Sequence, residues 1–186
     1  MSLKAVHYIN QFYAGIGGET MADTGFGILE EKKGPALGLE QLWNGEMTIS
    51  KVVYCGDNYV NNDENYGEVK EKLAKVIREE KPDVFIAGPA FNAGRYGVAC
   101  AKVCDYVRSE LGVPSVPCMW HETPAIDMYV ENNYIVPSTE TAVGMRKTLP
   151  ALAKLALKLA RKEKIGTAHA EGYLPTGHRY NEYSDK

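Results

Sequence analysis

The residues with the clearest chemical potential form a turn rich in glycine and asparagine. Residues 88–97 read Gly-Pro-Ala-Phe-Asn-Ala-Gly-Arg-Tyr-Gly, between an apolar run at 83–87 and a segment at 98–107 with helical apolar spacing. The first amides of a helix have no partners within it and attract anions, and Arg95 adds a planar cation that suits a carboxylate or phosphate. The pattern therefore predicts an anion site, although an ordinary strand-to-helix turn with a surface arginine fits it equally well.

Two further groups of polar or glycine residues follow predicted strands. Gly15-Ile-Gly-Gly-Glu19 comes after the apolar segment 5–12, and Trp120-His-Glu122 comes after 114–119. Gly-x-Gly-Gly alone is weak evidence, and no clear helix follows it, so a Rossmann dinucleotide fingerprint is not supported. The P-loop pattern is absent too.

Strands and helices alternate along the chain, which predicts parallel βαβ units with helices on both faces of a sheet. The expected strands are 5–12, 49–55, 83–87, 114–119 and 134–137. The expected helices are a short one at 37–43, then 66–80, 98–107, 124–131, and one from Ser138 or Thr139 to about 162 that Pro150 kinks or splits near Thr148. We therefore expect a doubly wound, three-layer α/β/α domain with a mostly parallel five-stranded sheet, flavodoxin-like or Rossmann-like.

The strand order of such a fold decides which turns meet. In the order 2-1-3-4-5 the chain reverses direction between strands 1 and 3, and ligands bind there, at the carboxyl ends of the strands. The turns at 15–18 and 94–97 follow those two strands, and residues 120–122 follow the next one. We expect all three segments to border one crevice, with strand 3 fully buried.

We expect one domain at 1–163 and an extended polar and aromatic tail at 164–186. The tail either lies over the domain, reaches a neighbouring subunit or leads toward a segment outside this sequence. A net charge of −3 gives no support for binding nucleic acid or a membrane surface, and no apolar run or signal layout predicts a membrane span or export, so a cytoplasmic protein is expected. The four cysteines lack paired metal spacing and are interpreted as core residues, so no metal site is expected.

Several of these segments together resemble a known family. Residues 6–12, 15–19, 85–100, 127–129 and 144–146 are similar to the amino-terminal half of component B, the substrate-specific selenoprotein subunit of clostridial glycine, sarcosine and betaine reductases. The resemblance runs from about residue 4 to Tyr180. It implies an anaerobic, amino-acid-fermenting source and reductive cleavage of a carbon–nitrogen bond in a small amino acid or methylated amine, with transfer of a two-carbon unit to a partner selenoprotein.

The resemblance also implies groups that this sequence does not carry. In the family, selenocysteine lies in the later half of the subunit, and a second component B polypeptide supplies a pyruvoyl group; no cofactor is expected in this chain itself. The sequence ends at Lys186 without a selenocysteine, which is expected either of an amino-terminal portion or of a short relative that needs another chain. The segment Trp120–Pro124 also differs from the family pattern, which leaves the substrate open.

For a zwitterion such as glycine, the resemblance and the chemistry together suggest roles for these residues. The substrate-binding candidates are the two turns, where Arg95 and the helix amides would hold the carboxylate, Glu19 or Glu122 would face the amine, and Asn92 would orient either end. His121 and Glu122 are the catalytic candidates because protonating a leaving amine needs an acid that titrates near neutral pH, although His121 also fits a plain strand end. The full binding set is Gly17, Gly18, Glu19, Asn92, Gly94, Arg95 and Tyr96.

Two functions therefore remain open from the sequence. One is a reductase subunit or fragment that forms the pocket for the amine and is inactive alone, with a pyruvoyl subunit and a selenoprotein as partners. The other is a non-catalytic binding or scaffolding domain that docks partner subunits. Self-association is compatible with both.

Overall fold

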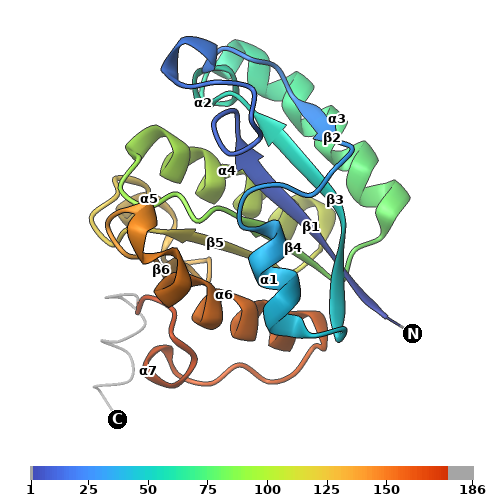
Figure 1. Ribbon diagram of the computed structural model, residues 1–186, viewed down its shortest axis with the longest axis vertical. Helices are drawn as coiled ribbons and strands as arrows, with labels where there is room; N and C mark the ends of the chain where they lie inside the picture. Colours follow the sequence, from blue (N-terminus) through green and yellow to red (C-terminus); the bar gives the residue numbers. More distant parts are fainter. Residues whose placement is uncertain (1, 176–186) are drawn as a thin grey trace.

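The computed structural model describes residues 2–175, and within that range the chain forms a six-stranded sheet with helices on both faces (Figure 1). The strands are β1 (Leu3–Asn10), β2 (Gly27–Leu29), β3 (Met47–Cys55), β4 (Val84–Ala87), β5 (Ser115–Met119) and β6 (Val136–Pro137). The helices are α1 (Ala36–Trp43), α2 (Asp57–Val60), α3 (Asp63–Glu80), α4 (Gly94–Leu111), α5 (Ala125–Tyr129), α6 (Met145–Ala160) and α7 (Ala168–Glu171), with 3₁₀ turns η1 (Glu19–Met21) and η2 (Ala142–Gly144).

The strand order is β2-β3-β1-β4-β5-β6, and every neighbouring pair is parallel except β2 with β3. The five strands expected from the sequence are β3, β1, β4, β5 and β6 in this order, so the doubly wound 2-1-3-4-5 arrangement is confirmed. All four residues of β4 are buried between β1 and β5, as expected of a central parallel strand. The chain therefore reverses direction between β1 and β4.

Two apolar cores cover the two faces of the sheet. Side chains alternate along a strand, so Val6 and Tyr8 of β1 face one core while Ala5 and Ile9 face the other. Helices α3 and α4 close the first core, and α1 and α6 close the second (Figure 1). His7 is also buried, and burial lowers its pKa to about 4, so this histidine is a neutral core residue.

The sequence prediction missed strand β2 and the short helices α2 and α7, placed the starts of α3 and α4 a few residues too late, and placed the start of α6 too early. Strand β2 is a three-residue antiparallel edge strand in the glycine-rich 20–46 segment, too short to give an alternating pattern. Helix α6 begins at Met145, not at Ser138 or Thr139, because the hydroxyl groups of both residues donate to nearby carbonyl oxygens and do not cap the helix. Pro150 lies within α6, which is one continuous helix and is not split.

The part of the tail that the structure describes lies against the domain. Helix α7 carries Glu171, which is buried and ion-paired with Lys158 at 2.7 Å. Tyr173 packs on Tyr134 with ring centroids 4.7 Å apart, and the amide of Leu174 donates to Ile135 O. Residues 176–186, which include His178 and Tyr180, lie outside the described residues. Between residues 2 and 175 no helix is both long and apolar enough to cross a bilayer.

The turn after β3 is held against the loop at residues 22–24 by backbone hydrogen bonds. Gly56 N donates to Thr24 O at 2.8 Å, and Asn58 N donates to Ala22 O at 2.8 Å. A Cβ atom on Gly56 would lie 2.3 Å from Ala22 O and 2.7 Å from Thr24 N, which are backbone atoms that cannot swing away. Glycine is therefore required here by space.

We predict that Gly56→Ala lowers the free energy of unfolding by roughly 1–3 kcal/mol, the usual cost of overpacking a close contact. Gly67→Ala is the matched control, because Gly67 lies inside α3 with nothing within 4 Å of the added Cβ. In that control the free energy of unfolding should rise by about 0.5–1 kcal/mol, because alanine has a higher helix propensity than glycine. Urea unfolding of both variants measures the difference, and equal stability of the two would contradict the packing of the 22–24 loop against Gly56.

Candidate functional site

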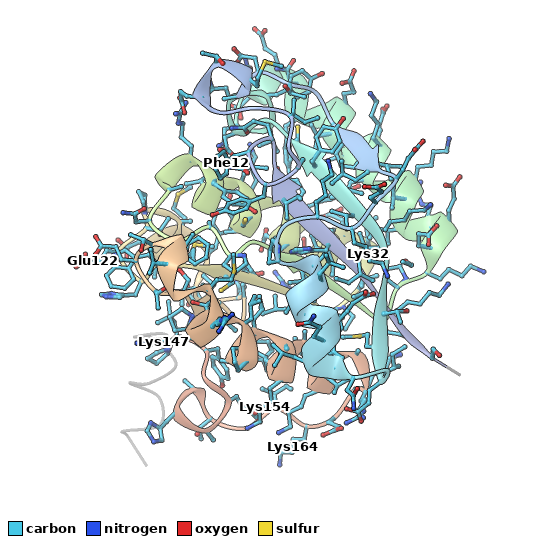
Figure 2. All side chains as sticks on the ribbon, viewed as in Figure 1. Phe12, Lys32, Glu122, Lys147, Lys154 and Lys164 are labelled. Atoms are coloured by element: carbon cyan, nitrogen blue, oxygen red, sulfur yellow. The ribbon has the colours of Figure 1, made fainter. Side chains whose placement is uncertain are left out.

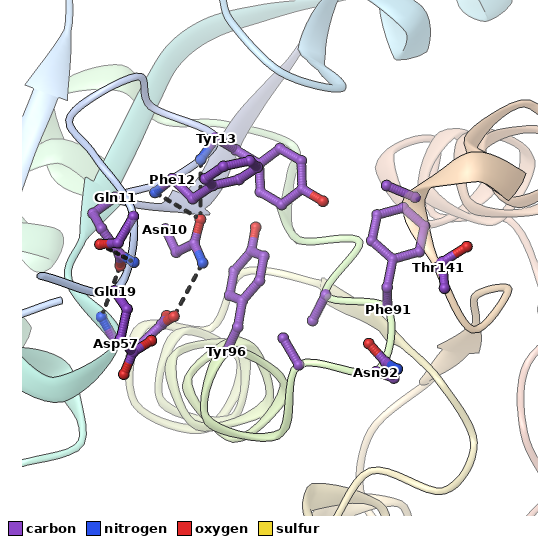
Figure 3. Close-up of a pocket in the computed structure, with 14 residues that line it drawn as sticks. Asn10, Gln11, Phe12, Tyr13, Glu19, Asp57, Phe91, Asn92, Tyr96 and Thr141 are labelled. Atoms are coloured by element: carbon purple, nitrogen blue, oxygen red, sulfur yellow. Dashed lines mark hydrogen bonds between the residues drawn. The ribbon is translucent and has the colours of Figure 1, made fainter. Parts of the chain in front are cut away.

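A pocket of about 320 Å³ opens at the carboxyl ends of β1 and β4, where the chain reverses direction (Figure 3). Its walls come from the loop after β1, the first residue of α2, the turn between β4 and α4, and the segment before α6. The lining residues are Asn10, Gln11, Phe12, Tyr13, Gly18, Glu19, Asp57, Ala90, Phe91, Asn92, Ala93, Tyr96, Thr141 and Ala142.

Asn10, the last residue of β1, connects two strand ends. Its side-chain oxygen accepts hydrogen bonds from the backbone amides of Phe12 and Tyr13, both at 3.1 Å. The amide orientation is therefore fixed by these contacts, and Nδ2 points the other way, toward Asp57 Oδ2 at 3.0 Å (Figure 3). The end of β1 thus holds the carboxylate that follows β3.

The side chain of Gln11 connects the loop after β1 to the backbone of Asp57. Its Oε1 accepts from Asp57 N at 3.1 Å, and its Nε2 donates to Gly18 O at 3.4 Å. The carbonyl of Gln11 accepts from the amides of Ile16 and Gly17. These contacts bring the glycine turn 15–18 against the end of β3, so the loop is built around Gln11.

Asp57 is a buried carboxylate with one free oxygen. Its side chain is 8% exposed, and Oδ1 has no hydrogen-bond partner among the described residues. Burial raises its pKa to about 6, while the hydrogen bond from Asn10 and the charge of Arg95 oppose the shift. An unpaired carboxylate oxygen in a pocket favours a ligand that brings a hydrogen-bond donor or a positive charge.

Aromatic rings form the opposite wall of the pocket. The Tyr13 ring lies 5.9 Å from that of Tyr96 and 6.4 Å from that of Phe91, measured between centroids. The Tyr96 hydroxyl is buried without a partner among residues 2–175, and burial raises its pKa well above the usual value. The hydroxyl therefore stays protonated at neutral pH and can donate or accept a hydrogen bond. Ring faces also attract organic cations.

The turn before α4 supplies the other end of the pocket. Its last residue, Ala93, lines the pocket and is the N-cap residue of α4, where no side chain caps the helix. The first helical residues Gly94 and Arg95 line the neighbouring cleft instead, and the backbone of Arg95 packs beside α2, where Asn61 Nδ2 donates to Arg95 O at 2.9 Å. Asn92 and Thr141 lie at the same end, away from Asp57 and Glu19 (Figure 3).

The residues singled out in the sequence fall into three places. Gly18, Glu19, Asn92 and Tyr96 line the pocket, so the two turns do meet at one crevice, while Gly17 is in the same loop but outside the lining. Gly94 and Arg95 line a second cleft of about 570 Å³, beside α5. The Arg95 guanidinium pairs with Glu19 and also donates to Asn58.

His121 and Glu122 do not line the pocket, contrary to the expectation that one of them would form its wall. Both are exposed: the His121 ring packs on Trp120 at 4.4 Å, and Glu122 accepts from Trp120 Nε1 at 3.3 Å. Thr123 turns the chain instead, since its hydroxyl donates to Trp120 O and its methyl group packs on Gly97.

The sequence prediction missed the residues at the centre of the network. Asn10 ends β1, which flanks the reversal point, and Asp57 follows β3, the strand next to β1; these positions at the carboxyl ends of neighbouring strands were the available signal. Tyr13, Phe91 and Thr141 carried no such signal. Within the described range, no three histidine, cysteine or acidic side chains gather closely enough to hold a metal ion.

Comparison with known proteins gives the family. The family model for the glycine/sarcosine/betaine reductase selenoprotein B (GRDB) matches residues 2–186. The chain belongs to this family. The expectation drawn from the sequence segments is thereby confirmed.

Named relatives within the family cover three kinds of reductase complex. The chain is 42% identical over 183 residues to the glycine reductase complex component B subunit gamma of Carboxydothermus hydrogenoformans, a match that spans 98% of this chain. It is 41% identical to the sarcosine reductase complex component B subunit beta and 35% identical to the betaine reductase complex component B subunit beta, both of Peptoclostridium acidaminophilum, over 99% and 98% of this chain. The chain spans only 41–42% of the length of these relatives. No solved structure gave a significant match.

The raised pKa of Asp57 predicts a pH-dependent stability. Below about pH 4 the carboxyl is protonated in both folded and unfolded states and contributes nothing. Between about pH 4 and pH 6 the folded state holds the proton more tightly, so the free energy of unfolding falls as pH rises, and above pH 6 the full cost is present. Two pKa units correspond to about 3 kcal/mol at most.

Asp57→Asn should therefore stabilise the protein by roughly 1–3 kcal/mol at pH 7.5 and by almost nothing at pH 4. Denaturant unfolding across this pH range measures the difference. Asp63→Asn is the control, because the Asp63 carboxylate is fully exposed. A gain from Asp57→Asn that is the same at both pH values would contradict the raised pKa.

Proposed function

We propose that this chain forms the binding pocket of a component B reductase subunit for a small zwitterionic amine, either glycine or one of its N-methylated forms. The observation that supports this most directly is the division of the pocket. A buried carboxylate lies at one end, and the neutral polar side chains of Asn92 and Thr141 lie at the other. A short amino acid carries opposite charges at its two ends and matches that division.

The ammonium end of the ligand would lie toward Asp57. The free Oδ1 of Asp57 and the hydroxyl of Tyr96 would accept N–H groups after a small movement into the pocket, and the rings of Tyr13 and Tyr96 would cover N-methyl groups through cation–π contacts. Glu19 adds a second carboxylate at this end, held in place by Arg95.

The carboxylate end of the ligand would lie at the turn before α4. The dipole of the helix that follows this turn favours a negative group near its N-terminus. Asn92 and Thr141 would orient it with side-chain hydrogen bonds. We assign Arg95 mainly to positioning Glu19, because its guanidinium is already paired.

Reductive cleavage of the carbon–nitrogen bond needs two electrons and a proton for the leaving amine. No cysteine lines the pocket, and all four cysteines are buried elsewhere. The family resemblance implies that a selenol and a pyruvoyl group supply this chemistry from other polypeptide segments and subunits. This chain would then bind and orient the amine, and His121 or Glu122 would transfer a proton only where such a partner brings the reacting atoms to the surface.

We predict that the chain binds glycine, N-methylglycine or N,N,N-trimethylglycine, and that Asp57→Asn weakens the binding of glycine or N-methylglycine, which carry N–H groups, about 10- to 100-fold. That loss corresponds to one charge-assisted hydrogen bond of about 1.5–3 kcal/mol. Isothermal titration calorimetry at pH 7.5 measures the affinities, and Asp63→Asn should bind as the unaltered chain does. Failure of the unaltered chain to bind any of the three compounds would contradict the proposal and favour a scaffolding domain.

We also predict that, in the presence of a dithiol, the purified chain alone releases no ammonia from glycine, no methylamine from N-methylglycine and no trimethylamine from N,N,N-trimethylglycine. The pocket offers no group that could accept electrons from the dithiol and pass them to the substrate. Anaerobic assays for the released amine and for acetate test this. Substrate-dependent turnover by the chain alone would show that the chemistry resides here.

A further inference from the structure

Exposed apolar side chains border the mouth of the pocket. Phe12 is 60% exposed, Ile16 37% and Met21 41%, all from the loop that follows β1, and Figure 2 labels Phe12 near the top of the molecule. Val143, in the η2 turn on the other side of the pocket, is 96% exposed and directly follows the lining residue Ala142. Exposed apolar side chains therefore lie on both sides of the pocket opening.

The fold itself does not require these four side chains at the surface. Their neighbours carry the packing: Tyr13 contacts both cores, and Ala14 and Ala22 are buried. The exposed Glu19 and Arg95 at the mouth form an ion pair. An apolar border around a binding pocket is typical of a surface that another protein surface covers.

The family relation indicates what covers it. The chain matches only 41–42% of the length of its relatives, so most of their polypeptide lies outside the matched region. The pocket lining includes no thiol and no imidazole, so it is incomplete for a reductase. A surface that closes over this mouth would also bring further groups to the ligand.

We propose that Phe12, Ile16, Met21 and Val143 form the docking surface for the region of the component B polypeptide that lies outside the match. That region packs on this border and closes the pocket. The proposal concerns an interface and not the ligand, so it stands or falls separately from the binding of glycine.

Cysteine labelling tests the interface in a full-length chain. Residues 2–186 replace the matched region of the Carboxydothermus relative, and Val143→Cys is introduced both there and in the isolated chain. The label is quantified by mass spectrometry on the peptide that carries the introduced cysteine, so neither the four buried native cysteines nor reactive groups in the relative's own region contribute. Leu42→Cys is the matched control: Leu42 is 47% exposed in α1, just before β3 begins at the opposite edge of the sheet.

The expected result is that the thiol introduced by Val143→Cys is labelled about tenfold or more slowly in the full-length chain than in the isolated chain, while the thiol introduced by Leu42→Cys reacts equally in both. Equal labelling of the Val143→Cys thiol in both chains would overturn the proposal. If the chimera does not fold, hydrogen exchange of the unaltered relative decides. Its segments that align with residues 11–22 and 141–144 should exchange more slowly than those segments of this chain, and equal exchange would overturn the proposal.

Discussion

The hydrogen bond from Asn10 to Asp57 joins the ends of β1 and β3, and the geometry of the pocket depends on it. Asn10 can donate to Asp57 only because its oxygen is held by two backbone amides of the loop that follows. Gln11 makes the reciprocal contact to the backbone of Asp57. One loop thereby places both its own glycine turn and the carboxylate of the neighbouring strand.

This arrangement carries a cost that indicates function. A carboxylate with a raised pKa and an unpaired oxygen destabilises the folded state at neutral pH, and Tyr96 adds a second buried polar atom without a partner among the described residues. His7, Tyr8, Ser50 and Asn61 also bury a polar atom without a partner in the described part of the chain, but none of them lines the pocket. A carboxylate with a raised pKa in a pocket at the reversal point of a doubly wound sheet is characteristic of a ligand site.

Much of the fold followed from the sequence because the patterns are strong. The buried run that became β4 and the helical spacing of α4 fixed a strand–turn–helix unit, and parallel topology then required the turns after β1 and β4 to meet. Asp57 was missed because nothing in the sequence shows that Asn10 reaches across to it. His121 and Glu122 follow β5, one strand further from the reversal point, and their side chains remain at the surface. The positions of residues at strand ends therefore predicted where the crevice lies. They did not predict which side chains line it.

The family relation and the pocket give one consistent account. In the proposed function the chain binds a small charged amine, and its relatives carry additional polypeptide that we propose packs over the apolar border. Binding and electron transfer would then belong to different regions of the assembly. Such a division explains a site that is well ordered by hydrogen bonds yet has no thiol of its own.

The central claim is that Asp57 faces the ammonium group of the ligand. The most direct measurement is a carboxyl carbon NMR titration of Asp57, with and without saturating glycine. The account predicts a pKa of about 6 in the free protein and a clear decrease when glycine is bound, because an adjacent cation favours the charged carboxylate. A pKa of Asp57 that is unchanged by bound glycine would contradict the account.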